Sequence, residues 1–143
     1  MRLLCSVFAA SLLMSLAQSA SAIKPFQDVF VKEYVDEESK TELTELASSK
    51  RLACLICHQG KKKKHHNPYG EHLEDLLDKK KDAKNKEKIL EALKKVAAMH
   101  SDPDDESSPT YGELIAEGKL PGGKLEDLKK EPEKKEEAES EEE

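Results

Sequence analysis

The residues best suited to chemistry in this 143-residue chain form one short run, Cys54-Leu55-Ile56-Cys57-His58. Two thiols three residues apart, followed at once by an imidazole, make a C-x-x-C-H sequence. On a helix, positions three apart lie on one face, so both sulfurs can form thioethers with the two vinyl groups along one side of a porphyrin. The run therefore predicts one covalently attached haem c, held through Cys54 and Cys57, with His58 as the proximal iron ligand.

The same cysteines allow two other interpretations. Cys54 and Cys57 could form a Cys2His2 zinc site with His65 and His66, although metal-binding histidines usually lie several residues apart. The pair could instead be a redox disulfide of the thioredoxin type, but that motif normally joins a strand to a helix, and no βαβ pattern is visible. The alternative to a haem protein is thus a small exported interaction or structural module with a disulfide or zinc site.

The N-terminus predicts export. Arg2 precedes an apolar run over residues 3–16, and Ala20-Ser21-Ala22 is an A-x-A-type cleavage site. The apolar run is too short for a comfortable membrane span. We therefore expect residues 1–22 to be a signal peptide, and the mature protein to be periplasmic or secreted without a stable membrane span. Once Cys5 leaves with the signal, only the two motif cysteines remain.

Apolar residues at helical spacing predict an all-α domain around the motif, because no stretch alternates with a period of two. The expected helices cover residues 26–34, 41–57, 73–77, 89–97 and 111–117. The segments 60–68 and 101–109 are expected to be loops. The domain is predicted to span residues 23–123, followed by a charged low-complexity tail over residues 124–143 that we expect to be disordered.

The chain resembles a small class I cytochrome c over residues 41–118. In both, a helix leads into C-x-x-C-H, and a lysine-rich loop, further helices, a methionine and a final helix follow. The segments 67–70 (Asn-Pro-Tyr-Gly), 110–115 and 118–121 are also similar to exported bacterial proteins of cytochrome c type. The resemblance implies haem binding and one-electron transfer to a redox partner protein, without turnover of a substrate.

The sixth iron ligand is commonly a methionine in that family. Met99 is the only methionine after the predicted signal peptide, so the resemblance implies Met99 as the distal ligand. A methionine at a helix end can equally be a core residue. The other candidates are His65, His66, His72 and His100, or an open position, which would favour ligand sensing or peroxidase-like chemistry.

Charge is distributed unevenly along the chain. Residues 61–95 contain 12 Lys against 7 acidic residues, whereas residues 124–143 contain 5 Lys against 10 acidic residues. The run Lys61–Lys64 could steer an acidic redox partner toward the motif, or could be an ordinary solvated loop. The net charge of −6 argues against a nucleic-acid partner.

Overall fold

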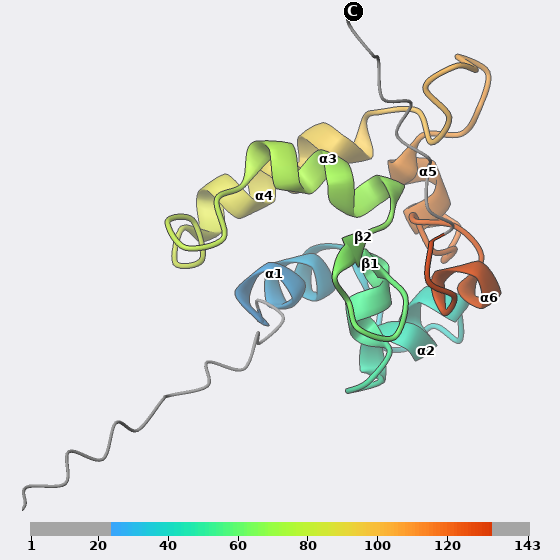
Figure 1. Cartoon of the computed structure of the whole chain (residues 1–143), viewed down its shortest axis with the longest axis horizontal. Coiled ribbons are helices and arrows are strands. Elements are labelled where there is room, and N and C mark those ends of the chain that lie inside the picture. The colour runs from blue at the N-terminus through green and yellow to red at the C-terminus, as the bar shows by residue number, and fades with distance from the viewer. Residues whose placement is uncertain (1–23, 133–143) are drawn as a thin grey trace, which may run out of the picture.

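The protein folds into short helices arranged around a small hairpin (Figure 1). The computed structural model describes residues 24–132, so the predicted signal peptide lies outside the described residues. In chain order the elements are α1 (Lys24–Tyr34), α2 (Glu42–Ser48), the 3-10 helix η1 (Ala53–Ile56), β1 (His58–Gln59), β2 (His65–His66), α3 (Pro68–Leu76), α4 (Lys86–Ala97), α5 (Tyr111–Ala116) and α6 (Leu125–Leu128). Within residues 24–132 no helix has the length and apolarity needed to cross a membrane.

The expectation of an all-α fold is wrong. β1 and β2 pair as an antiparallel sheet, with His58 opposite His66 and Gln59 opposite His65. Each strand has only two residues, so no alternation could show in the sequence. The connecting loop returns the chain on itself and includes positive φ angles at Gly60 and Lys63. The fold is therefore mixed, mainly helical with a minor sheet that begins inside the C-x-x-C-H motif.

The helix predicted over residues 41–57 is interrupted before the motif. α2 ends at Ser48, and η1 begins only at Ala53. In the turn between them the Ser49 hydroxyl accepts a hydrogen bond from the Leu52 backbone N–H at 3.3 Å. Serine side chains that bond to nearby backbone groups compete with helix formation. The motif is therefore reached through a turn and a 3-10 helix instead of a continuous α-helix.

The apolar core is built mainly on α4. Ile89, Leu93 and Val96 recur at helical spacing on one face and are at most 1% exposed. This face packs against α1, which contributes the buried Phe30, and α3 and α5 also pack against α4. Figure 1 shows α3 and α4 above the hairpin and α1 beside it. The apolar face predicted for residues 89–97 is confirmed.

Two buried tyrosines connect the start of α3 to this core. The Tyr69 and Tyr111 rings meet edge to face with centroids 5.3 Å apart. The Phe30 ring lies 6.0 Å from Tyr69 in a similar edge contact. Such pairs add to the stabilisation that comes from apolar burial. Because α3 directly follows β2, the aromatic cluster fixes one end of the motif hairpin against the helices.

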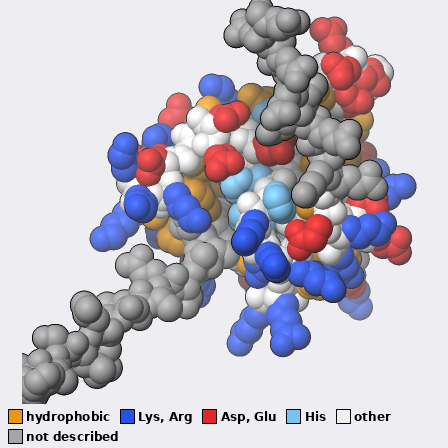
Figure 2. Space-filling model, viewed as in Figure 1, with side chains coloured by type: hydrophobic (Ala, Val, Ile, Leu, Met, Phe, Trp, Pro, Cys, Tyr) orange, Lys and Arg blue, Asp and Glu red, His pale blue; other side chains and the backbone are white. Residues whose placement is uncertain are grey.

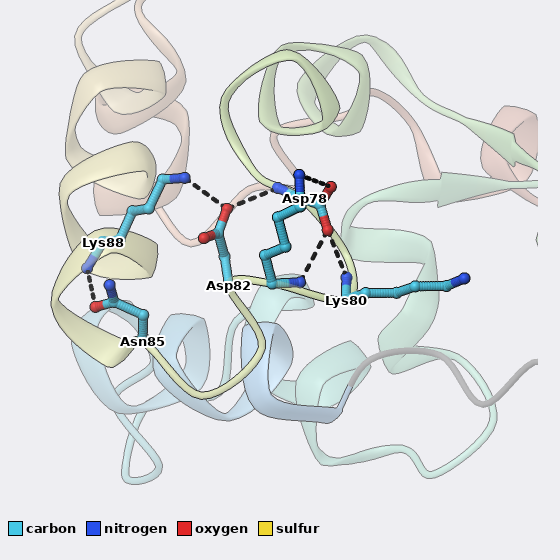
Figure 3. Close-up of polar contacts among 6 residues, drawn as sticks. Asp78, Lys80, Asp82, Asn85 and Lys88 are labelled. Carbon is cyan, nitrogen blue, oxygen red and sulfur yellow. Dashed lines mark hydrogen bonds and ion pairs between the residues drawn. The ribbon is translucent and has the colours of Figure 1, made fainter.

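The connection between α3 and α4 is organised by a buried carboxylate (Figure 3). Asp82 accepts hydrogen bonds from the Lys88 ammonium at 2.6 Å and from the Asp78 backbone N–H at 2.8 Å. The Lys88 contact and then the backbone bond hold the pKa of Asp82 below its ordinary value. Asn85 caps α4, since its Oδ1 accepts from the Lys88 backbone N–H at 3.0 Å. These bonds define where α4 begins.

Helix α6 contacts the motif hairpin from the C-terminal side. The Leu128 carbonyl accepts from the Gly60 backbone N–H at 2.9 Å, and the Asp127 carbonyl accepts from Gln59 Nε2 at 3.3 Å. The Leu128 side chain is 2% exposed and belongs to the core. The tail predicted to begin at residue 124 therefore starts with a packed helix.

Candidate functional site

The two thiols of the motif are carried by one tight turn. Cys54 belongs to η1, and Cys57 ends it by donating its backbone N–H to the Cys54 carbonyl at 3.3 Å. Residues three apart are eclipsed in a 3-10 helix, so the turn directs both side chains the same way. Both cysteines are free and half-buried. The motif expected on an α-helix thus lies on a 3-10 helix.

The two sulfurs meet different surroundings. Burial, with the neighbouring charge of Cys54 adding to it, raises the pKa of the Cys57 thiol to about 12. Cys54 instead accepts a hydrogen bond from the Lys63 ammonium, with Nζ and Sγ 3.1 Å apart. Lys63 reaches it from the hairpin loop, where its backbone has a φ of 53°. Cys57 is therefore a neutral thiol at physiological pH, whereas Cys54 faces a cation.

His58 occupies the first position of β1, next to both thiols. Burial lowers its pKa to about 4; positive charge at His66, Lys79 and Lys63 acts in the same direction, and an interaction with the His65 backbone acts against it. The ring is therefore neutral at pH 7, which is the form that binds a metal. Its Nδ1 atom is buried and has no hydrogen-bond partner among the described residues. A buried nitrogen without a partner is uncommon and marks His58 as a candidate ligand.

A second histidine covers one face of the His58 ring. The His66 ring stacks on it with centroids 4.5 Å apart and an interplanar angle of 28°. His66 is held in turn by Glu74 of α3, with Nδ1 and Oε2 2.8 Å apart. Figure 2 shows histidine side chains gathered near the middle of one face of the molecule, with Lys and Arg side chains beside them. The hairpin therefore joins a candidate ligand to a second imidazole.

Asn67 is the residue of the site that sequence analysis did not identify. It is fully buried, and its Nδ2 donates to the Leu55 carbonyl at 3.0 Å and to the Ile56 carbonyl at 3.1 Å. Its Oδ1 caps α3 by accepting from the Gly70 backbone N–H at 2.9 Å. An Asn followed by Pro at a helix start is a recognisable capping signal. That signal predicts the cap, but not the bonds to the motif.

Gly70 lies directly against the motif backbone. A Cβ atom at this position would overlap the Cys57 carbonyl. The same carbonyl accepts a hydrogen bond from the Asn67 backbone N–H at 3.1 Å. The segment 67–70, which resembles cytochrome c-type proteins, is thus the N-cap and first turn of α3, and it packs on the motif.

The candidate sixth ligands are spread over the fold. Met99 follows α4, packs against the apolar core, and accepts a backbone hydrogen bond from Tyr111 at 2.9 Å. His100 bonds to the Ser108 carbonyl at 2.6 Å through Nδ1. His72 contacts the Tyr111 ring edge to face. No hydrogen bond or ring contact of the described residues joins Met99, His72 or His100 directly to the motif, whereas His66 touches His58.

The described residues contain no group of three or more His, Cys, Asp or Glu side chains placed to hold a metal ion. A structural zinc site needs four converging protein ligands. The four candidates Cys54, Cys57, His65 and His66 do not form such a group within residues 24–132. His65 is exposed on the hairpin, whereas His66 stacks on His58. The site therefore contains two thiols followed along the chain by one neutral imidazole, and these do not form a four-ligand metal site.

Comparison with protein-family models, with curated proteins and with solved structures finds no match to this chain.

Proposed function

We propose that this chain is an exported protein that binds one haem c covalently through Cys54 and Cys57, with His58 as the proximal ligand, and transfers single electrons in the cell envelope. The single observation that carries the proposal is the arrangement of the motif. A 3-10 turn carries two free thiols three residues apart, and the next residue is an imidazole whose buried Nδ1 has no hydrogen-bond partner within residues 24–132.

The donor set suits a haem better than a bare metal ion. A porphyrin supplies four of the ligands to its iron, so the protein needs to contribute only one or two axial side chains. His58 is neutral at pH 7 and available for that role. A zinc site would instead need further side chains to converge on the same point. The bound group would supply the one-electron redox chemistry, and the chain supplies attachment, ligation and burial.

The roles of the two cysteines follow from their chemistry. In each attachment the S–H group adds across a vinyl group, so that sulfur bonds to one carbon and the proton goes to the other. No oxidant is consumed. Cys54 and Cys57 present their sulfurs from one turn, so both bonds can form along one side of the ring. Lys63, which now donates to the Cys54 sulfur, must release it for this bond to form.

Three further parts of the proposal each have an observation of their own. Met99 stays a prediction for the distal position, based on the resemblance and on its half-buried place after α4. Export is supported by the sequence pattern of residues 1–22. An acidic redox partner is supported by the exposed lysines of the run Lys61–Lys64, three of which are solvent-exposed.

The test is the mass and optical spectrum of the full chain, produced in an exporting host with c-type maturation machinery. We expect one haem-sized mass increase that survives denaturation, and haem absorption bands. Replacing both cysteines (Cys54→Ala with Cys57→Ala) should abolish the mass increase. His58→Ala should lose the spectrum of a histidine-ligated haem, whereas His65→Ala, a matched change at an exposed histidine of the same hairpin, should leave both signals unchanged.

Other masses would contradict the proposal in distinct ways. A chain lighter than the reduced protein by two hydrogens, with no haem absorption, would identify a disulfide module. Bound zinc that is lost in Cys57→Ala would identify a zinc site. For the distal ligand, Met99→Ala should change the spectrum of the oxidised protein. An unchanged spectrum would show that Met99 is not the distal ligand, and the histidines would then be the remaining candidates.

A further inference from the structure

The backbone of the motif is held by one residue from outside it, Asn67, through both its side chain and its backbone N–H. The carbonyls of four consecutive residues, Leu55 to His58, all face Asn67. The Asn67 Nδ2 lies 3.0, 3.1 and 3.4 Å from the carbonyls of Leu55, Ile56 and His58. The Asn67 backbone N–H bonds to the remaining carbonyl, that of Cys57, at 3.1 Å. We call this set of contacts the Asn67 clamp.

The surroundings of the Asn67 clamp leave no room for another side chain. Asn67 is 0% exposed, and its bonds to the Leu55 and Ile56 carbonyls are buried, whereas the contact with the His58 carbonyl is partly buried. Gly122, in the turn before α6, lies against the carboxamide, and a Cβ atom there would overlap it. A buried acceptor that loses its donor costs free energy, because water cannot replace the lost bond. The carboxamide is therefore enclosed by the motif, by α3 and by the C-terminal turn.

The chemistry of the clamp is specific to an amide. Its Oδ1 must accept from Gly70, and its Nδ2 must donate to carbonyls. An aspartate would keep the acceptor but would place a second, negatively charged oxygen against the carbonyls of Leu55 and Ile56. Capping alone does not require this, since Asp and Asn are equally good at a helix N-cap. The Nδ2 group of Asn67 thus donates to the motif, whereas Oδ1 caps the helix.

We propose that Asn67 is a positioning residue that sets the backbone of the Cys54–His58 motif, so that both sulfurs and the imidazole are presented together for haem attachment. This inference rests on the proposed function. It assigns Asn67 no contact with the haem itself. Asn67 acts through the carbonyls that it binds, and its effect should therefore appear in the thiols and the imidazole even in haem-free protein.

The experiment compares Asn67→Asp with a matched control, Asn85→Asp. Both changes convert an N-cap asparagine to aspartate, but Asn85 is exposed and caps α4 (Figure 3), whereas Asn67 caps α3 and bonds to the motif. A third variant, Val96→Ala, weakens the buried core without touching the clamp. Two quantities are measured on the full chain: the fraction with covalent haem after export with maturation machinery, and the rate at which iodoacetamide alkylates Cys57 in reduced, haem-free protein.

We expect Asn67→Asp to lower haem attachment and to raise the Cys57 alkylation rate, each by about tenfold, as for the loss of a buried hydrogen-bond donor. Asn85→Asp and Val96→Ala should both stay within about twofold of the parent chain, at a temperature where circular dichroism shows all variants folded. If Asn67→Asp matches Val96→Ala in both measurements, Asn67 contributes stability alone and the proposal is overturned.

A second variant keeps the test decisive if Asn67→Asp does not fold. Gly122→Ala should displace the carboxamide without changing its chemistry, and Gly112→Ala, a similarly crowded site in α5, is its control. A change in Cys57 alkylation with Gly122→Ala alone supports the clamp, and equal behaviour of the two variants overturns it. If the parent chain takes up no haem, the proposed function fails, and the alkylation rates still decide whether Asn67 positions the motif.

Discussion

Two regions of the molecule are stabilised differently: a helical half formed by α1, α4 and α5, and a motif half formed by η1, the β1–β2 hairpin and the start of α3. Around α4, buried apolar side chains such as Ile89 and Val96 recur on one face and pack against α1. In the motif half, the chain passes through a 3-10 helix and two short strands, and its backbone is tied by hydrogen bonds to Asn67 and α6. Both halves contribute to one apolar core, which includes Leu55 and Ile56, but the irregular backbone of the motif half also depends on a few polar contacts.

This comparison suggests how a small domain can stabilise a reactive segment that is not part of a regular helix. Regular helices satisfy their own backbone groups, so the packing of α1 and α4 needs only apolar complementarity. A 3-10 helix and a loop leave carbonyls unpaired, and these need donors from elsewhere. Asn67 supplies donors to these carbonyls, and the Leu128 carbonyl in turn accepts a hydrogen bond from the backbone N–H of Gly60 in the loop. We expect substitutions in either half to lower global stability, but only those in the motif half to change the chemistry of the motif as well.

The largest expected effect is a loss of stability on replacing either of two buried isoleucines, one in each half. Ile89→Ala in α4 and Ile56→Ala in η1 both remove side chains that are at most 2% exposed and belong to one core cluster. Each should lower the free energy of unfolding by about 2–5 kcal/mol. Only Ile56→Ala should also speed alkylation of Cys57. Chemical denaturation and thiol labelling measure both effects, and equal labelling of the two variants would remove the distinction between the halves.

A smaller effect is expected at Gly70. Gly70→Ala forces a Cβ atom onto the Cys57 carbonyl and should cost about 1–3 kcal/mol, the usual range for overpacking. Because the clash lies on the motif, it should also lower the yield of covalent haem. Gly112→Ala meets the Ala97 carbonyl at 2.9 Å and is the control in the helical half. It should lose stability with haem attachment intact, and a loss of attachment in both would contradict the prediction.

The third prediction concerns pH in haem-free protein. The pKa of His58 falls from an ordinary 6.5 to about 4 on folding. Below pH 6.5 the unfolded chain binds a proton that the folded chain does not take up until about pH 4, so stability should fall as the pH is lowered through this window. His58→Gln should remove this dependence, and His65→Gln should keep it. Thermal melts at several pH values test this, and an unaltered dependence in His58→Gln would refute it.

The smallest effect is expected at the start of α5, in the helical half. Thr110 and Glu113 form a capping box, with the Thr110 hydroxyl accepting from the Glu113 backbone N–H and the Glu113 carboxylate accepting from the Thr110 backbone N–H. Thr110→Ala should cost about 1 kcal/mol. Haem attachment should be unchanged, because the box does not contact the motif. Thermal denaturation and mass measurement together check this, and reduced attachment would show that the two halves are coupled.

The sequence alone determined those features that depend on neighbours along the chain. The spacing of Cys54, Cys57 and His58 predicts a motif carried on one helical turn, and a turn of 3-10 helix is found there. The apolar period of residues 89–97 predicts the helix found as α4. Spacing of three or four residues constrains side-chain direction directly, whatever the rest of the fold does.

Only the tertiary structure decided how the motif is held. The return of the chain at residues 60–64 brings His66 onto His58, and creates the sheet that an all-α interpretation excluded. The same return places Asn67 under four carbonyls, and α6 against Gly60. These contacts join residues that no helical or strand period relates, so no pattern in the sequence specifies them. They form because buried carbonyls must find donors, and the packed helices determine which donor lies within reach.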